Sequence, residues 1–436
     1  MANISASNIM TTNTDKPSFN TVTPSQPHSQ SYAELWRYRL KHHRRRYIIF
    51  ILTPFLLFTL YLLTHLTFYI RANIAHNNFM AGKTPQQIIN AHNATPKSDR
   101  AKRLITLLET LDETSLTMDP IDPNDPMSMG QQRIQVLNTA TNIVSLMQAA
   151  EPVPQEKIDL VNNYIKKHQA EINALKVYRD LGPVPLPIKQ HAFNTYGIFI
   201  HLETIRLRIT LNLQQRNAQA VFDDLLLLTQ IKSFSSQTPS IEILENRADV
   251  IAHLGYALKI TLIQELLNKS QLKTLQDAIK KHPLNLKTTL IDAYRITTQQ
   301  FLLQTNQTLT QQHNNGLPKF TTYYGLYARN YTFVKELDHL AFYQLQQDFL
   351  TQLNLNIPYN KLWSIYNTAL KAEPEMYYLT RYSKSNIDNL YHILLNENQL
   401  DLMRFQIARQ LYYLDHNKFP NNLSELVPDY IEKIPQ

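Results

Sequence analysis

The chain has 436 residues and no cysteine, which excludes disulfide bonds, thiolate catalysis and cysteine-ligated metals. Only 7 glycines occur in it, whereas a β-rich protein of this length needs more for hairpin turns with positive φ, so we expect an all-α fold. Residues 1–46 hold seven basic and two acidic residues, and therefore +5 of the formal net charge of +8. The other basic residues are dispersed, so the charge does not indicate a nucleic-acid interface.

The N-terminal part of the sequence predicts a tail followed by a membrane anchor. Residues 1–31 are rich in Asn, Ser, Thr and Pro and poor in apolar side chains, so we predict a disordered tail. After a basic juxtamembrane segment, residues 32–46, the stretch 47–70 carries no formal charge. A helix needs about 20 apolar residues to cross a bilayer. A signal peptide has an apolar core of about 7–15 residues and a small-residue cleavage site, which is not evident here. We therefore predict an uncleaved transmembrane helix over 47–70.

The charges on either side of this stretch predict its orientation. Only Arg71 and Lys83 follow it closely. Six cations precede it, positioned to set the topology and to contact anionic lipid: Arg37, Arg39, Lys41, Arg44, Arg45 and Arg46. Because basic residues stay on the cytoplasmic side, we expect a cytoplasmic N-terminus and an exported domain beginning at residue 71.

Beyond the anchor, apolar spacing predicts helices separated by proline-rich breaks. The first group covers residues 97–111, 131–149 and 155–179. The segment Gly182-Pro-Val-Pro-Leu-Pro187 is the strongest breaker, and it indicates either a subdomain boundary or an extended segment that packs across helices. We divide the exported part into a first helical subdomain, a main helical domain and a C-terminal helix-turn-helix tail, over residues 71–182, 183–398 and 399–436.

The sequence of the main domain predicts helices joined by short polar links. Helices joined in this way usually pack as antiparallel neighbours. The pattern favours a multi-helix α-α arrangement, like a tetratricopeptide solenoid or a bundle, although no 34-residue repeat is present. The predicted helices cover 192–213, 218–231, 241–267, 270–281, 286–309, 336–353, 359–372, 385–395 and 402–414. An aromatic patch begins near residue 320, where Tyr324, Tyr327 and Tyr331 share one helical face. These three tyrosines are either a recognition surface for a glycan or peptide, or core residues.

The sequence carries none of the common catalytic signatures. The sequence has no H-E-x-x-H, G-x-S-x-G or Rossmann glycine pattern. One Glu-x-x-His is present, Glu336 to His339, but a di-iron site needs two such motifs and two further glutamates. Asp223 and Asp224 point about 100° apart on a helix, and a solvated face is the default for them. We predict no catalytic, cofactor-binding or metal-binding residues.

The C-terminus carries the most distinctive pattern. Residues 409–435 read RQLYYLDHNKFPNNLSELVPDYIEKIP, in which Asn422 and Glu425 form a capping-box-like start of a short helix. This string resembles the Y-x-L-D-H-x-x-x-P-x-x-L-x-x-L-V-P-x-Y-x-x-x-I-P tail of an uncharacterised family of bacterial membrane-anchored helical proteins. Its turn is also similar to one in type II secretion pseudopilins. The helical region from His201 to Leu302 resembles the same family.

The resemblance and the anchor together imply a single-pass protein of the bacterial inner membrane with a periplasmic domain. We expect an interaction scaffold in the cell envelope, with the lipid bilayer and envelope proteins as partners, no nucleic acid, no cofactor and an unidentified small-molecule ligand, if any. The alternatives are a hydrolase of envelope polymer and a glycan-binding protein. Convergent acids near His253 or His339 would favour the hydrolase, and exposed Tyr324, Tyr327 and Tyr331 would favour the glycan binder.

Overall fold

The computed structural model describes residues 32–118, 129–188, 195–300, 302, 334–354, 361, 364, 368 and 384–434. All regular structure in these residues is helical, which confirms the all-α prediction. The tail at residues 1–31 lies outside the described part. The chain separates into two units, residues 1–64 and 65–436, which are taken in turn.

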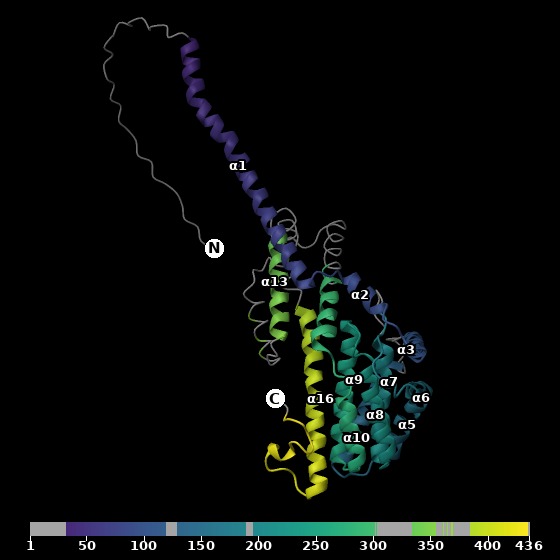
Figure 1. Ribbon diagram of the computed structural model, residues 1–436. Coiled ribbons are helices and arrows are strands. Elements are labelled where there is room, and N and C mark those ends of the chain that lie inside the picture. Colours follow the sequence, from purple (N-terminus) through teal and green to yellow (C-terminus); the bar gives the residue numbers. More distant parts are fainter. Residues whose placement is uncertain are drawn as a thin grey trace, which may run out of the picture. The chain divides into compact units, whose positions relative to one another are not determined.

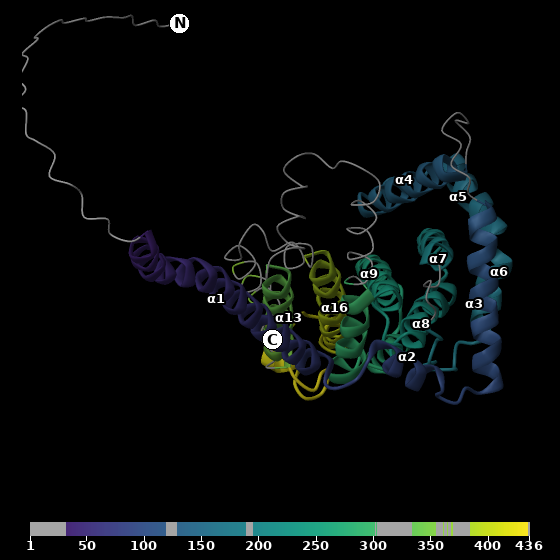
Figure 2. The ribbon, with the colours of Figure 1, turned by 90° about the horizontal axis from the view of Figure 1, so that it is seen from above.

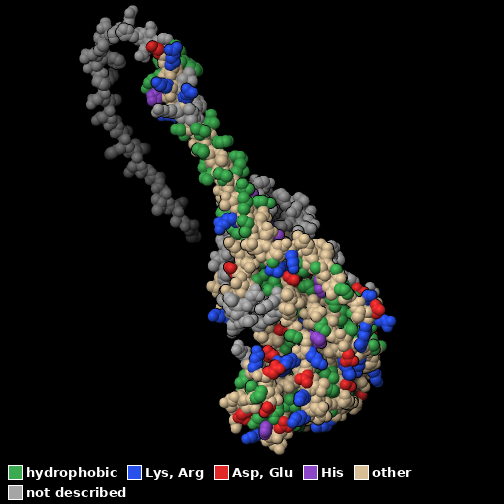
Figure 3. Space-filling view, in the orientation of Figure 1, with side chains coloured by type: hydrophobic (Ala, Val, Ile, Leu, Met, Phe, Trp, Pro, Cys, Tyr) green, Lys and Arg blue, Asp and Glu red, His purple; other side chains and the backbone are tan. Residues whose placement is uncertain are grey.

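The first unit consists of the N-terminal part of helix α1, Tyr32–Met80. The predicted juxtamembrane and apolar segments form one continuous helix, with Pro54 inside it. Its most apolar window is completely unburied, and Phe50, for example, is 80% exposed. Figure 3 shows hydrophobic side chains along this stretch and basic side chains gathered nearer its N-terminal end. By length and composition, this helix is suited to cross a membrane.

The second unit begins with the end of α1, which is buried and held in place. Phe79 and Met80 lie in a core with the helix at residues 291–300 and with α13, Val334–Asn354. Arg295 Nε donates to the carbonyl of Phe79 at 2.7 Å. Helix α2, Pro85–Asn93, follows, and Thr84 caps it in a capping box with Gln87.

Four helices then lie along one side of α7, Thr195–Gln214. They are α3, Asp99–Met118; α4, Met129–Gln148; α5, Gln155–Lys167; and α6, Gln169–Lys176 (Figure 2). The predicted helix 155–179 is interrupted at His168. This residue is both the C-cap of α5 and the N-cap of α6. The outer helices bury apolar residues such as Val136 and Ile143 against Leu207 of α7.

The segment at residues 181–188 is extended and packs across helices, as one of the two interpretations of Gly182 to Pro187 predicted. Gly182 adopts φ +73°, which a residue without Cβ tolerates. The Val184 amide donates to the Phe234 carbonyl at 3.2 Å, and Asn93 exchanges two hydrogen bonds with the Ile188 backbone. The division into subdomains at this segment remains a prediction.

Helix α9, Ile241–Ile263, is central to the second unit, because it contacts α7, α8 and α16 (Figure 1). Helix α8 is Ala218–Phe234, and α16 is Lys384–His416. Helix α10, Lys269–Lys280, packs on α8 and α16, and a π-helical turn, Leu286–Leu290, leads into the helix at 291–300. The largest apolar core joins α3, α6, α7, α8, α9, α10 and α16.

Two predicted helices, 385–395 and 402–414, are in fact one helix, α16. The polar run that separates them in the sequence is accommodated by tertiary contacts. Asn396 is buried and donates to the His392 carbonyl at 2.9 Å, while Glu397 binds a buried arginine of α9. The helix therefore continues through residues whose composition indicates a break.

The C-terminal tail folds back onto α16 and α10. A short 3-10 helix, Leu423–Leu426, begins with the predicted capping box between Asn422 and Glu425. Leu426 and Ile431 pack against Ala408 and Tyr412 of α16. Gln276 of α10 donates to the Arg404 and Tyr430 carbonyls, so α10 also supports the tail.

Candidate functional site

The residues chosen from the sequence fall in two places. Arg37, Arg39, Lys41, Arg44 and Arg46 are exposed on the N-terminal part of α1; Arg45 lies in the same helix, and its side chain is outside the described part. Tyr324, Tyr327 and Tyr331, the predicted recognition surface, also lie outside the described residues.

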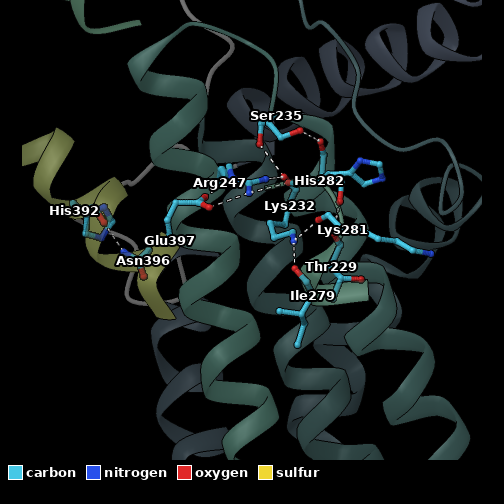
Figure 4. A network of polar contacts seen from close by, with 12 residues as sticks. Thr229, Lys232, Ser235, Arg247, Ile279, Lys281, His282, His392, Asn396 and Glu397 are labelled. Atoms are coloured by element: carbon cyan, nitrogen blue, oxygen red, sulfur yellow. Dashed lines mark hydrogen bonds and ion pairs between the residues drawn. The ribbon is translucent and has the colours of Figure 1, made fainter. Parts of the chain in front are cut away.

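Buried polar side chains form a network around Arg247 (Figure 4). Arg247 of α9 is 0% exposed. Its Nε and Nη2 bind the two carboxylate oxygens of Glu397 on α16, at 2.5 and 3.2 Å. Its remaining contacts are with the backbone: Nη1 donates to the Lys232 carbonyl, and Nη2 donates to the His282 carbonyl at 3.3 Å. Arg247 thus joins α8, α9, α16 and the chain after α10.

Lys232 is the second cation of this network, and it too is 0% exposed. Its Nζ donates to the carbonyls of Ile279 at 2.8 Å and Lys281 at 3.0 Å, which are the unpaired acceptors at the C-terminal end of α10. Burial, and then the nearby Arg247 charge, lower the pKa of Lys232 to about 7, while Glu397 acts in the opposite direction. The Glu397 carboxylate thus balances the charge of Arg247, whereas Lys232 loses its proton near neutral pH.

The sequence carried a signal for both cations. Lys232 continues the apolar face of α8 that Val221, Leu225 and Leu228 form, and Arg247 lies among the buried apolar residues of α9. A long basic side chain at an apolar position of a helix indicates a buried, paired cation. Neither Lys232 nor Arg247 is among the site residues predicted from the sequence.

A narrow apolar pocket lies beside the network, between α3, α6, α7, α8 and α9. Leucine side chains such as Leu108 and Leu175 form its walls, with Arg247 and His201 among the few polar groups. His201 is 5% exposed, and its Nδ1 has no hydrogen-bond partner. Burial, and then His168, lower the pKa of His201 to about 4, so the ring is neutral. The cavity volume is about 40 Å³, which holds a few water molecules and not a drug-sized ligand.

A second cluster lies on one face of α9, where Glu242, Glu245, Asp249 and His253 follow each other at helical spacing. Burial, then the Glu242 and Asp249 carboxylates, raise the pKa of Glu245 to about 7. Burial also raises the pKa of Asp249, and the nearby His392 opposes this. Burial and Arg206 lower the pKa of His253 to about 4. We call these four residues the acidic face of α9.

The remaining sequence motifs act as ties between helices. Asp224 is buried and receives two hydrogen bonds from Arg208, one at 2.7 Å, so the expected solvated face is wrong for it. Asp223 faces outward, 3.4 Å from Arg179. Glu336 lies 3.4 Å from His65 Nε2. Among the described residues, no group of three or more acids or histidines is arranged to hold a metal ion.

No known protein family matches this chain, and searches of curated proteins and of solved structures found no match. The geometry of its own residues is therefore the basis for a functional proposal.

Proposed function

We propose that this protein is a single-pass membrane protein whose helical part, from residue 71 onward, is an interaction scaffold in the cell envelope. The observation that carries the anchor is the unburied apolar stretch of α1. Burying a Phe or Leu side chain is worth about 1.5–3 kcal/mol, so a helix that leaves a long series of such side chains exposed gains a large free energy on entering lipid.

The orientation rests on the basic residues that precede this stretch. In this proposal the N-terminus lies in the cytoplasm and the helical part lies in the periplasm, on the outer side of the inner membrane. Reporter fusions at both ends of the chain test it: a reporter active only outside the cytoplasm should be active after residue 434 and inactive before residue 37. Replacing the six basic residues from Arg37 to Arg46 with Gln should produce chains of mixed orientation. Activity of the exported reporter at the N-terminal fusion alone would overturn the proposal.

The scaffold role is supported by the use of the buried polar groups. In the Arg247 network and in the Arg208 to Asp224 pair, charged side chains form hydrogen bonds between helices. Such ties fix helix positions and leave the surface for partners. Crosslinking in intact cells, followed by identification of the captured proteins, tests this role. Recovery of envelope proteins by the full chain, and not by the membrane anchor alone, is the expected result.

The acidic face of α9 favours a second candidate function, hydrolysis of an envelope polymer. A carboxyl group with a pKa about 7, next to two further acids, is suited to general acid or base catalysis. The purified protein, incubated with isolated envelope polymer, would then release soluble fragments. Glu245→Gln should abolish the release, whereas the exposed control Glu265→Gln should not. Absence of release by the unmodified protein would eliminate this candidate.

A further inference from the structure

A pocket at the end of α1 has walls from two helices. Arg71, Ile74, Ala75 and Asn78 of α1 form one wall, and Leu340, Tyr343, Gln344, Gln347 and Asp348 of α13 form the other. Its cavity volume is about 350 Å³. This is within the range of small-ligand sites, about 300–1,000 Å³.

The two walls are held together independently of any ligand. Tyr343 of α13 packs against His76 and Phe79 of α1, with ring centroids 4.9 and 5.9 Å apart. The Tyr343 hydroxyl accepts a hydrogen bond from Gln299 at 2.9 Å. Arg295 holds the Phe79 carbonyl from a third helix. The pocket is thus preformed by buried contacts beneath it.

Two charged side chains of the pocket have no ion pair within the described residues. Arg71 and Asp348 line the same pocket and are both exposed, yet neither has an ion pair with the other or with any other described residue. The α1 wall therefore carries a cation, and the α13 wall carries a carboxylate.

This arrangement fits a ligand with an anionic group and a hydrogen-bond-donating cation. A phosphate suits the guanidinium of Arg71, whose fork of N–H groups binds phosphate oxygens. A primary ammonium suits Asp348, because its N–H groups donate hydrogen bonds to the carboxylate. A quaternary ammonium has no N–H group and cannot make such a bond.

The place of the pocket along α1 indicates the source of such a ligand. Arg71 directly follows the apolar stretch 47–70 on the same continuous helix. At 1.5 Å per residue, Arg71 to Asn78 span about 10 Å, comparable with the headgroup layer of about 5–8 Å on one side of a bilayer. Ile74, Ala75 and Leu340 offer an apolar side to the carbons next to a headgroup.

We propose that the pocket between α1 and α13 binds the headgroup of a phosphoethanolamine-type phospholipid, with its phosphate on Arg71 and its ammonium on Asp348. This site rests on the membrane-spanning function proposed above. It gives the helical part a fixed contact with the outer surface of the bilayer in addition to the anchor.

Lipid retention by the purified full chain tests the proposal. The protein is placed in bilayer discs that contain equal amounts of phosphatidylethanolamine, phosphatidylcholine and phosphatidylglycerol with the same acyl chains, and retained lipid is measured by native mass spectrometry. We expect the ethanolamine lipid to be retained about tenfold over the choline lipid, the ratio that one hydrogen bond to a charged group gives. Equal retention of these two lipids would overturn the proposal.

Two variants and two controls assign the contacts. Asp348→Asn should reduce the preference for ethanolamine over choline about tenfold, and Arg71→Gln should weaken retention of all three lipids. The control substitutions Asp388→Asn and Arg103→Gln, at exposed positions, should change neither the preference for ethanolamine over choline nor the retention of the three lipids. An unchanged preference in Asp348→Asn would refute the ammonium site. Retention of water-soluble glycerophosphoethanolamine as strongly as the lipid would refute a membrane source.

Alkaline extraction of the same membranes separates this inference from the proposed function. Protein that resists extraction but shows no preference for the ethanolamine lipid keeps its anchor and lacks the site. Protein that is released by alkali lacks both, because the pocket then has no bilayer beside it.

Discussion

The buried amine of Lys232 predicts that the folded protein becomes more stable as pH rises above about 7. The pKa of Lys232 is about 7 in the folded state, against 10.5 for the free side chain. Between these values the unfolded chain binds a proton that the folded chain does not, so the free energy of unfolding rises with pH. Below pH 7 both states are protonated, and the unfavourable contribution is constant.

The magnitude follows from the linkage relation. Each pH unit between the two pKa values adds about 1.4 kcal/mol, so Lys232 contributes on the order of 2 kcal/mol between pH 7 and 9. Its hydrogen bonds to Ile279 and Lys281 need not be lost on deprotonation, because a neutral amine keeps two N–H donors for two carbonyls.

The measurement compares Lys232→Met with the unmodified full chain in detergent. Denaturant unfolding is followed by the helical circular dichroism signal at pH 7, 8 and 9. The unmodified chain should gain stability relative to the variant as pH rises, whereas Lys273→Met, at an exposed position of α10, should follow the unmodified chain. Parallel pH profiles of the unmodified chain and Lys232→Met would refute the reasoning.

Three further substitutions test an ion pair, the apolar stretch of α1 and a helix cap. Glu397→Gln leaves Arg247 without its only carboxylate partner in the described residues and should lower the free energy of unfolding by about 3–5 kcal/mol, measured by denaturant titration. Leu57→Arg, in the middle of the apolar stretch, should disfavour membrane insertion by about 3 kcal/mol, seen as more alkali-extractable protein; unchanged extraction would contradict the anchor. Asn422→Ala removes the side-chain cap of the 3-10 helix Leu423–Leu426 and should lower the free energy of unfolding by about 1 kcal/mol. It should speed proteolysis after Leu414, and equal rates would contradict this.

Helix content and helix ends were predictable where local chemistry decides them. Few glycines, helical apolar spacing and proline breaks predicted most of the helices that the structure describes, although not α2. The Asn422 to Glu425 capping box was also predicted and is confirmed. These features depend on residues within one turn of each other. The break expected between residues 395 and 402 is wrong, because Arg247 satisfies the charge of Glu397 inside a continuous helix.

The polar clusters could not be assembled from the sequence, because their members come from distant helices. Asp223 and Asp224 look equivalent along the chain, yet only Asp224 meets Arg208 in the interior. The pocket of Arg71 and Asp348 joins residues of α1 and α13, which are far apart in the sequence. Contacts of this kind are decided by which helices pack together, and local pattern holds little information on this.

The sequence alone determined that this chain is helical and that residues 47–70 are suited to a bilayer, because both properties follow from local composition and periodicity. Only the tertiary structure decided which charges are buried, since burial depends on neighbours from other parts of the chain. It placed Lys232 and Arg247 inside and left Arg71 and Asp348 facing one pocket. The pKa of Lys232, for example, is set by desolvation and by the nearby charges of Arg247 and Glu397.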